Sequence, residues 1–404
     1  MGALRNGSNL LCFIITCVLG LVGFSCDYQT KSTDIYENSL GSEISLIIDE
    51  WRDHEKATGA LVSVYSEKLG LRDFVSGYST ITRYPDKYPN KSIDTNRPLP
   101  IGDVGHIFLG ARIVQLISKG DLNLDDRLIK WFPDVNNSES ITVQDLLYHS
   151  SGIPVFYQSE KLNTFLVNDE LDIFEPDKII KMADQEGTYF EPGQEYGYSK
   201  TNYIILGRII ENITGNNIET DLEENIFQKL HLTQTFFGFS ENNPDGMPVG
   251  YEFVGDFTNN PNVIDGHVPH MITDEQVSVE WASGGIFSTT PDLIKSVRTL
   301  HNGFFSEKEY AIFNKLGNKV ANEDGAKEIQ VTPGMFRWLD DYGVVIGQFG
   351  FLYPFSAQVI YWPDTDVAIS VIINEVDASI NPNSNFQLPV IDSLVNKLSP
   401  LLHE

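Results

Sequence analysis

Stretches with the alternating pattern of β-strands lie near both ends of this 404-residue chain and enclose a long middle part with helical patterns. Residues 57–66, "ATGALVSVYS", and residues 72–81, "RDFVSGYSTI", are the early stretches. The late ones are "YGVVIGQFG", "FSAQVIYWP" and "VAISVIINEV". This order predicts an α+β fold in which both chain ends form one antiparallel sheet with flanking helices, next to a mostly helical subdomain at about residues 103–303.

Helical spacing of apolar residues predicts two further helices that frame this body. One covers residues 42–56, "SEISLIIDEWRDHEK", and the other closes the chain with "QLPVIDSLVNKLSPLLHE". The polar residues 27–40 before the first helix predict a flexible tether. We therefore expect one folded domain over residues 41–404.

The first 26 residues differ in kind from the rest of the chain. They contain one Arg, no acidic residue and an apolar run from Leu10 to Phe24. This composition is typical of a secretory signal peptide and predicts an exported protein. A membrane-spanning helix is the competing interpretation, but the run is short of the roughly 20 apolar residues that a span needs.

All three cysteines, Cys12, Cys17 and Cys26, fall inside this first segment, so the body has no disulfide to hold it together. Cys26 follows small and apolar residues and precedes a polar stretch, as at a bacterial lipoprotein cleavage site. Gly23 stands where that pattern prefers leucine. We expect Cys26 to be lipidated and to anchor the protein to a membrane; simple cleavage nearby is the alternative.

The charge of the chain excludes one class of partner. Asp and Glu number 56 against 28 Lys and Arg, which gives a formal charge of −28 at pH 7. Such a surface repels phosphate backbones and anionic lipids. We expect no nucleic-acid partner, and contact with a membrane only through the lipid anchor.

Several stretches, in a fixed order from about residue 57 to residue 375, resemble the serine β-lactamase and penicillin-recognising hydrolase family. The likeness is greatest to its class C β-lactamase-like branch of esterases and D-alanyl peptidases. The stretches are "SKGDLNLDDRLIKWFPD", "ITVQDLLYHSSGIP", "EPGQEYGYSKTNYIILGRIIENITG", "WASGGIFSTTPDLIKSVRTLHNG" and "FSAQVIYWPDTDVAISVIIN". The resemblance implies the fold of β-lactamases and transpeptidases.

The catalytic motifs of the family are altered at three places. Where its "SxxK" motif places the nucleophilic serine and a lysine, this chain has Asp103 and His106, and it contains no other SxxK. The "YxN" motif corresponds to Tyr198 and, in place of the asparagine, Lys200. The "HxG" or "KTG" motif corresponds to "QFG", with Gln348 in place of the basic residue and Gly350 retained. The resemblance assigns ligand contact to Gln348, Gly350 and Phe351.

These replacements remove the groups that the family uses for serine acylation. Acyl transfer needs a nucleophilic hydroxyl, a base and backbone donors aimed at the oxyanion. Asp103 has no hydroxyl, and its attack on an ester or amide would form a high-energy mixed anhydride. Ser199 is the nearest alternative nucleophile in sequence, although the resemblance implies that it faces away from the reacting carbonyl.

The same replacements also compensate one another. An acid enters at residue 103, a lysine leaves at residue 106 and a new cation enters at residue 200. Because an unpaired buried carboxylate is costly, we expect the Lys200 ammonium to lie within about 4 Å of the Asp103 carboxylate.

Each of these residues also has a purely structural interpretation. Asp103 could cap its helix and pair with Lys200 only, or do acid/base work. His106 could be a hydrogen-bonded semi-buried histidine or a proton carrier. Tyr198 could be a retained general base or a packed aromatic that contacts a ligand. His267 and His270 in "DGHVPH" are a weak metal signal, and we predict neither a metal nor a cofactor.

Two functions, and a variant of the second, follow from this pattern. The first is an exported β-lactamase-related protein that has lost serine acylation and keeps a binding cleft for peptidoglycan-type peptides or acylated small molecules. The second is an active enzyme in which Asp103, His106, Tyr198 and Lys200 do altered acid/base chemistry. Its variant is a hydrolase that uses another serine. A closed pair between Asp103 and Lys200 favours the first function, and separated groups favour the second.

Overall fold

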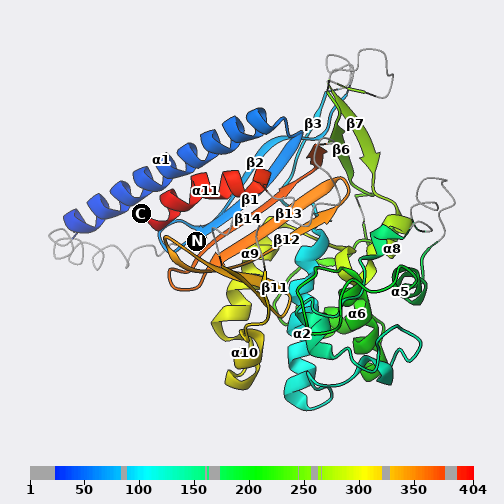
Figure 1. Cartoon of the computed structure of the whole chain (residues 1–404). Helices are drawn as coiled ribbons and strands as arrows, with labels where there is room; N and C mark the ends of the chain where they lie inside the picture. The colour runs from blue at the N-terminus through cyan, green and yellow to red at the C-terminus, as the bar shows by residue number, and fades with distance from the viewer. Residues whose placement is uncertain are drawn as a thin grey trace, which may run out of the picture.

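The computed structural model describes residues 23–82, 89–159, 162, 173–243, 245–255, 263–264, 266–320, 328–377 and 389–404. Within these ranges the main feature is a nine-stranded sheet whose neighbouring strands are all antiparallel (Figure 1). The order is β3 (Lys91–Ser92), β2 (Gly70–Thr80), β1 (Gly59–Ser66), β14 (Val367–Ile373), β13 (Phe355–Trp362), β12 (Gly343–Leu352), β11 (Met335–Asp340), β10 (Ile329–Thr332), β9 (Lys319–Val320).

The two ends of the chain meet at the centre of this sheet. Strand β1 pairs with β14 from Ala60 opposite Ile373 to Tyr65 opposite Ala368. The prediction of one antiparallel sheet built from both ends, in an α+β fold, is confirmed. Both faces of β14 are buried, because helices cover the sheet on each side.

Helix α1 (Gly23–Glu55) and helix α11 (Pro389–His403) lie side by side against this sheet (Figure 1). The Trp51 indole of α1 donates a hydrogen bond of 2.9 Å to Ser393 of α11. Helix α9 (Thr290–Thr299) packs against β1, β13 and β14 from the other side. Leu40, Ile44, Ile48 and Trp51 are buried at helical spacing, which explains the predicted helix over residues 42–56.

Helix α1 begins earlier than the sequence pattern indicates. It runs from Gly23 through residues 27–40, where we predicted a flexible tether. Residues 27–40, "DYQTKSTDIYENSL", are mostly polar, so apolar spacing could not reveal these turns. Residues 1–22 and the side chain of Cys26 lie outside the described part, so the signal peptide and the lipidation site stay predictions.

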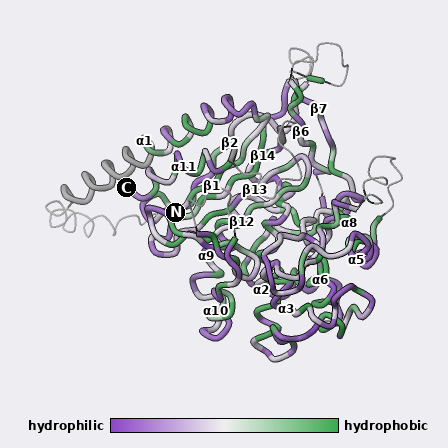
Figure 2. The backbone as a smooth tube through the Cα atoms, viewed as in Figure 1, coloured by the Kyte–Doolittle hydropathy of each residue, from purple (hydrophilic) through white to green (hydrophobic). Residues whose placement is uncertain are grey.

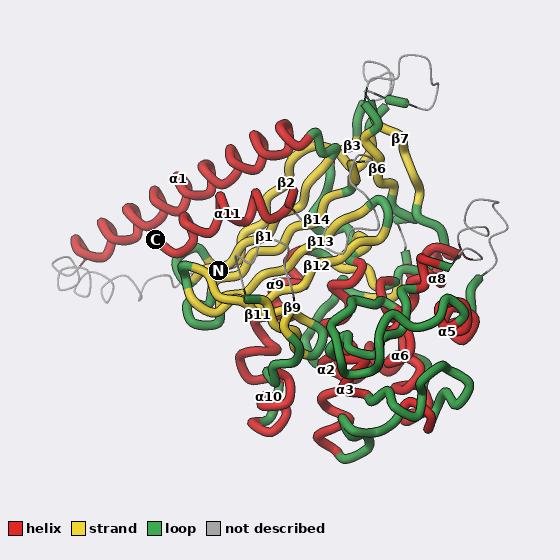
Figure 3. Tube along the Cα trace, in the orientation of Figure 1, coloured by secondary structure: helices red, strands yellow, loops and turns green. Residues whose placement is uncertain are grey.

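The helical part of the molecule lies beyond one edge of the sheet (Figure 3). Two small sheets occur in the same chain, with orders β15-β6-β7 and β4-β8-β5. The remaining helices are α2 (His106–Lys119), α3 (Val143–Leu147), α5 (Pro176–Asp184), α6 (Thr201–Thr214), α7 (Ile218–Leu222), α8 (Asp274–Gly284) and α10 (Glu307–Phe313). The strands of the small sheets are β4 (Leu99–Pro100), β5 (Phe236–Phe237), β6 (Val249–Phe253), β7 (His267–Met271), β8 (Ile286–Ser288) and β15 (Glu375–Asp377).

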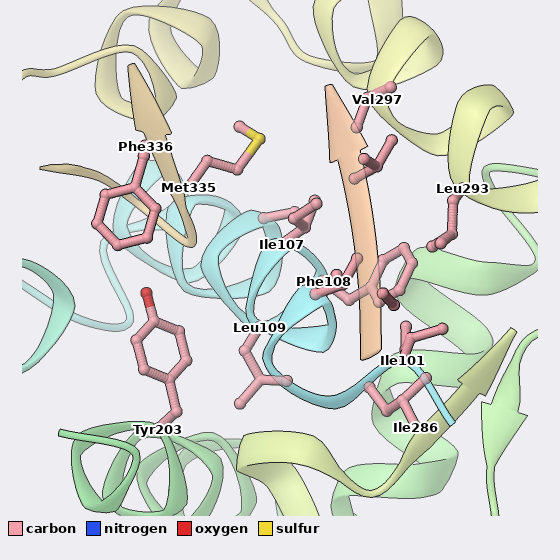
Figure 4. Packing of buried hydrophobic residues seen from close by; sticks show 14 of the residues in the cluster. Ile101, Ile107, Phe108, Leu109, Tyr203, Ile286, Leu293, Val297, Met335 and Phe336 are labelled. Atoms are coloured by element: carbon pink, nitrogen blue, oxygen red, sulfur yellow. The ribbon is translucent and has the colours of Figure 1, made fainter. Parts of the chain in front are cut away.

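Helix α2 is the buried link between the sheet and the helical part. Hydrophobic residues run along it and along the central strands (Figure 2). Ile107, Phe108 and Leu109 are fully buried at its start, among side chains from strand β11 and helices α6 and α9 (Figure 4). This packing fixes the start of α2 relative to β12, and the residues of the altered motifs lie there.

Candidate functional site

The short 3-10 helix η1 (Gly102–Gly105) leads into α2 and lies directly on strand β12. Two glycines permit this approach. A Cβ on Gly102, whose φ is +51°, would collide with the backbone of Phe351, and a Cβ on Gly350 would collide with the carbonyl oxygen of Ile101. This contact explains the retained glycine of "QFG" and brings Asp103 to the backbone of Phe351.

The Asp103 carboxylate is bound on both oxygens. Its Oδ1 accepts a hydrogen bond of 2.7 Å from the Tyr198 hydroxyl. Its Oδ2 accepts one of 3.3 Å from the N–H of Phe351 and lies 3.3 Å from the Lys200 ammonium. The expected ion pair is confirmed. No side-chain cap occurs at η1 or α2, so the explanation of Asp103 by helix capping is wrong.

Lys200 also binds a second acid, Glu280, which sequence reasoning did not single out. Its Nζ donates to both carboxylate oxygens of Glu280, at 3.1 and 3.2 Å, and to the carbonyl oxygen of Phe351, at 2.9 Å. The Tyr157 hydroxyl donates to Glu280 from another side. Glu280 and Lys200 are buried, so two acids share one cation away from solvent.

The backbone next to Glu280 departs from helical geometry. Trp281 has φ 37° and ψ −119°, a kink inside α8 that non-glycine residues rarely adopt. The kink falls one residue after the carboxylate that contacts Lys200. Such strained positions concentrate at functional sites, where the surrounding structure holds them.

The environment of this cluster shifts the pKa values of Lys200 and Glu280. Burial by itself would lower the pKa of Lys200, but the carboxylates of Asp103 and Glu280 raise it above its ordinary value. Burial raises the pKa of Glu280, and Asp103 adds to this, while the opposing effects of Lys200 and Tyr157 offset the shift only in part. Glu280 therefore releases its proton less readily than a solvent-exposed Glu.

Two histidines beside the cluster are fully enclosed. Burial and the charge of Lys200 lower the pKa of His106 well below its ordinary value, and a backbone group of Ser283 opposes this only in part. The His106 ring stacks on Tyr203 with centroids 3.6 Å apart, and within the described chain its nitrogens make no hydrogen bond of normal geometry. Burial lowers the pKa of His149 to about 3. Both rings are held neutral. His106 Nε2 lies 3.7 Å from Asp103 Oδ1, beyond hydrogen-bonding distance, so the hydrogen bond expected for His106 is not found among the described residues.

Tyr198 is a hydrogen-bond donor in this site. Burial, followed by the charge of Asp103, raises its pKa well above its ordinary value. A hydroxyl that donates to a carboxylate and resists deprotonation favours a packed, hydrogen-bonding tyrosine over a general base. Its role here is to hold the Asp103 carboxylate.

Gln348 is buried and uses both ends of its amide inside the protein. Its Nε2 donates to the carbonyl oxygen of Gly334 at 3.1 Å, and its Oε1 accepts from the N–H of Phe349 at 3.1 Å. Phe351 is half-buried and offers its backbone to Asp103 and Lys200. Ligand contact by Gln348, Gly350 and Phe351 stays a prediction.

The two histidines of "DGHVPH" lie on β7 with different partners. His267 Nε2 is 3.3 Å from Glu375, and His270 Nε2 is 3.3 Å from Glu252. In the described part of the chain no group of three or more His, Cys, Asp or Glu could hold a metal ion. The same part contains no helix with the length and apolar character that crossing a membrane requires.

Sequence reasoning missed Glu280 and Tyr157. A signal existed for Glu280, because it is a single charge between apolar and small residues in "VSVEWASGG", a context typical of a buried acid. Tyr157 follows Phe156 in a short 3-10 helix (Phe156–Gln158), and nothing in its sequence context distinguishes it.

The comparisons with known proteins identify the class. A β-lactamase family model matches residues 59–383, so this chain belongs to the β-lactamase family. The "Putative penicillin-binding protein PbpX" of Bacillus subtilis is 25% identical over 307 residues, which are 73% of this chain and 70% of that protein. "Protein flp" of Staphylococcus aureus is 30% identical over 277 residues, 66% of this chain but only 50% of its own length.

Solved structures show the same fold. The D-amino acid amidase of Ochrobactrum anthropi SV3 superposes with a TM-score of 0.74 at 20% identity, covering 90% of this chain and 98% of its own. The octameric penicillin-binding protein homologue of Pyrococcus abyssi superposes with a TM-score of 0.70 at 22% identity, covering 89% and 77%. At these identities the likeness concerns the fold.

Proposed function

We propose that this chain is an exported, lipid-anchored member of the β-lactamase family that does not acylate and that binds a ligand instead. The main support for this proposal is the environment of Asp103. It stands at the nucleophile position with its carboxylate bound by Lys200, Tyr198 and the N–H of Phe351. No hydroxyl is offered to a substrate carbonyl there. The closed ion pair between Asp103 and Lys200 supports a site without catalysis over a site with altered acid/base chemistry.

Two further observations support the loss of acylation. The Tyr198 hydroxyl donates a hydrogen bond to Asp103, which favours a structural role for it over that of a base for a nucleophile. Ser199, the nearest alternative serine, has a buried Oγ that lacks a hydrogen-bond partner among the described residues. A serine nucleophile needs a base within hydrogen-bonding reach.

The ligand class of the proposal comes from the relatives. Their names refer to penicillin binding and to D-amino acid amides, and peptidoglycan-type peptides or acylated small molecules share these features. Export and lipidation at Cys26 belong to the proposal, since they rest on the sequence of residues 1–26. Altered acid/base catalysis is less well supported, because Asp103, Lys200 and Glu280 are buried and paired with one another.

Intact-mass measurement with a penicillin and with a fluorophosphonate tests the loss of acylation. We expect no covalent adduct on the protein with residues 1–26 removed. The variant with Asp103→Ser and His106→Lys also stays largely unlabelled, because Gln348 still replaces the basic residue of the third motif. A stoichiometric adduct on any serine of the unmodified protein would overturn the proposal. A muropeptide binding screen on the same protein tests the ligand class.

A further inference from the structure

Glu280 has no part in the loss of acylation, yet Lys200 holds it as closely as it holds Asp103. The Lys200 Nζ lies 3.3 Å from Oδ2 of Asp103, and 3.1 and 3.2 Å from the two carboxylate oxygens of Glu280. All three side chains are more than nine-tenths buried. One carboxylate is enough to neutralise one buried ammonium, so the second carboxylate calls for another explanation.

An amine between two carboxyl groups is the arrangement that amide formation needs. The amine is a nucleophile, one carboxyl group is its acyl acceptor, and the other carries protons between them. The contact with Oδ2 places the amine of Lys200 next to the carboxyl carbon of Asp103. Groups held in this way can react as if at concentrations of about 10⁵–10⁸ M, which opposes the unfavourable equilibrium of amide formation in water.

Aromatic and uncharged side chains enclose these three groups. The ring of Tyr157 lies 5.4 Å from Nζ of Lys200, and its hydroxyl donates to Glu280. The rings of His106 and His149 beside them are neutral, because burial lowers their pKa values. Such an environment limits the access of water that would hydrolyse an amide.

Two neighbours are placed to assist the reaction. The Tyr198 hydroxyl donates a hydrogen bond of 2.7 Å to Oδ1 of Asp103, where negative charge develops when the carboxyl carbon is attacked. Burial raises the pKa of Glu280, so its carboxylate accepts a proton more readily than an exposed Glu. Burial by itself would lower the pKa of Lys200, but the two carboxylates raise it above its ordinary value, so the neutral amine is scarce and the reaction is slow.

We infer that Lys200 and Asp103 condense to an isopeptide bond, with Glu280 as the proton carrier. Glu280 takes a proton from the ammonium of Lys200, and the freed electron pair of Nζ attacks the carboxyl carbon of Asp103. The N–C bond forms, and the bond from that carbon to Oδ2 breaks. The ammonium loses two protons in all, and Glu280 passes both to the departing oxygen, which leaves as water. Glu280 returns to its initial state, and no other reactant is needed.

This inference goes beyond the proposed function, because it assigns to the chain a reaction on itself. The bond joins the 3-10 helix before α2 to the residue before α6. It also removes Asp103 and Lys200 from any acid/base chemistry on a ligand.

Mass spectrometry of the full-length protein tests the bond. We expect the unmodified protein to be lighter than its sequence by one water, in a fraction that grows over days at pH 7. Trypsin then releases residues 92–112 joined to residues 182–208, because the bonded Lys200 is no longer a cleavage site. Lys200→Arg is the control, since it keeps the charge without the amine. Its mass stays constant, and residues 92–112 and 182–200 appear as separate peptides.

A second variant tests the proton carrier. Glu280→Gln keeps the size of the side chain but cannot take a proton from Lys200, so we expect no linked peptides from the folded variant. Where Glu280→Gln does not fold, Glu280→Asp, whose carboxylate is one methylene shorter in reach, is followed in the same way and forms the bond more slowly.

A folded unmodified protein without linked peptides, or a loss of water located at other residues, overturns the inference. Linkage at an equal rate in the folded Glu280 variant overturns the role of Glu280. A covalent adduct with the penicillin or the fluorophosphonate would instead overturn the proposed function, so the two failures are distinguishable.

Discussion

Two buried charge clusters of this protein differ in their balance of charge. Arg112 of α2 and Asp221 of α7 form a one-to-one pair with two hydrogen bonds, the longer one of 3.0 Å. Around Lys200, two carboxylates share one ammonium. The first cluster is a neutral link between helices, whereas the second retains an excess acid inside the protein. Unbalanced buried charge with shifted pKa values is typical of functional sites, and it lies where the family motifs were replaced.

The largest expected effect is at Lys200. The substitution Lys200→Asn restores the family residue but leaves Asp103 and Glu280 buried without their cation. Removing one partner of a buried ion pair typically lowers the free energy of unfolding by about 3–5 kcal/mol. Because two acids lose their cation here, we expect the free energy of unfolding at pH 7 to fall by at least that amount. Adding Asp103→Ser recovers part of it, because Glu280 remains. Urea unfolding of the unmodified protein, Lys200→Asn, Asp103→Ser and the double variant measures the coupling energy between residues 103 and 200. A coupling energy of zero would mean that the two replacements are unrelated.

The pH dependence of that loss follows from Glu280. Its pKa is raised by burial, so the folded protein holds a proton that the unfolded chain has released above its ordinary pKa. Stability from this group therefore falls as the pH rises above about 4.5. In Lys200→Asn both acids gain from protonation, and the loss shrinks when the pH is lowered from 7 towards 5. Lys200→Arg, which keeps the charge, is the control.

The second effect is at Arg112. Replacing it with Met leaves the Asp221 carboxylate buried without a cation. We expect the free energy of unfolding to fall by about 3–5 kcal/mol. The additional change Asp221→Leu removes the stranded charge and recovers most of the loss. This contrasts with the Lys200 cluster, where removing one acid recovers only part. Equal recovery in the two clusters, measured by urea unfolding, would contradict the difference in charge balance.

The sequence allowed the fold to be predicted because its pattern is periodic. Short runs rich in β-branched and aromatic residues, such as those of β1 and β13, mark strands by a local rule, and the order of strands and helices restricts the topology. The pairing of Asp103 with Lys200 was predictable for another reason. Both residues stood at replaced positions of known motifs, and their opposite charges compensated each other.

The rest of the site was not predictable because it depends on three-dimensional contacts between distant segments. Glu280 reaches Lys200 across 80 positions of the chain, and no periodic pattern encodes that approach. The binding of Phe351 by Asp103 depends on the close contact of η1 with β12, which two glycines permit. The helix-capping role expected for Asp103 was wrong for the same reason. Its carboxylate binds Tyr198 and Phe351, which are distant in the sequence, and not the N–H groups of its own helix.

The smallest expected effect concerns His149, a neutral neighbour of the charged cluster. Its pKa is lowered by burial to about 3, so in the folded protein it stays uncharged while the unfolded chain takes up a proton below its ordinary pKa. Its contribution to stability is therefore complete above about pH 6.5 and is lost as the pH falls towards 3. His149 has φ 53°, a conformation that Asn tolerates, so His149→Asn is the suitable variant.

This variant should be less stable than the unmodified protein at pH 7, because the ring accepts a hydrogen bond of 3.2 Å from the N–H of Ser199. The difference should shrink by about 2 kcal/mol between pH 7 and pH 5, since only the unmodified protein bears the cost of keeping this ring neutral. Taking the difference between the two proteins removes the opposite trend of Glu280, which they share. Urea unfolding at pH 7, 6 and 5 measures it. A difference that does not change with pH would mean that His149 takes up its proton equally in the folded and unfolded states, and that the neutral region beside the cluster does not exist.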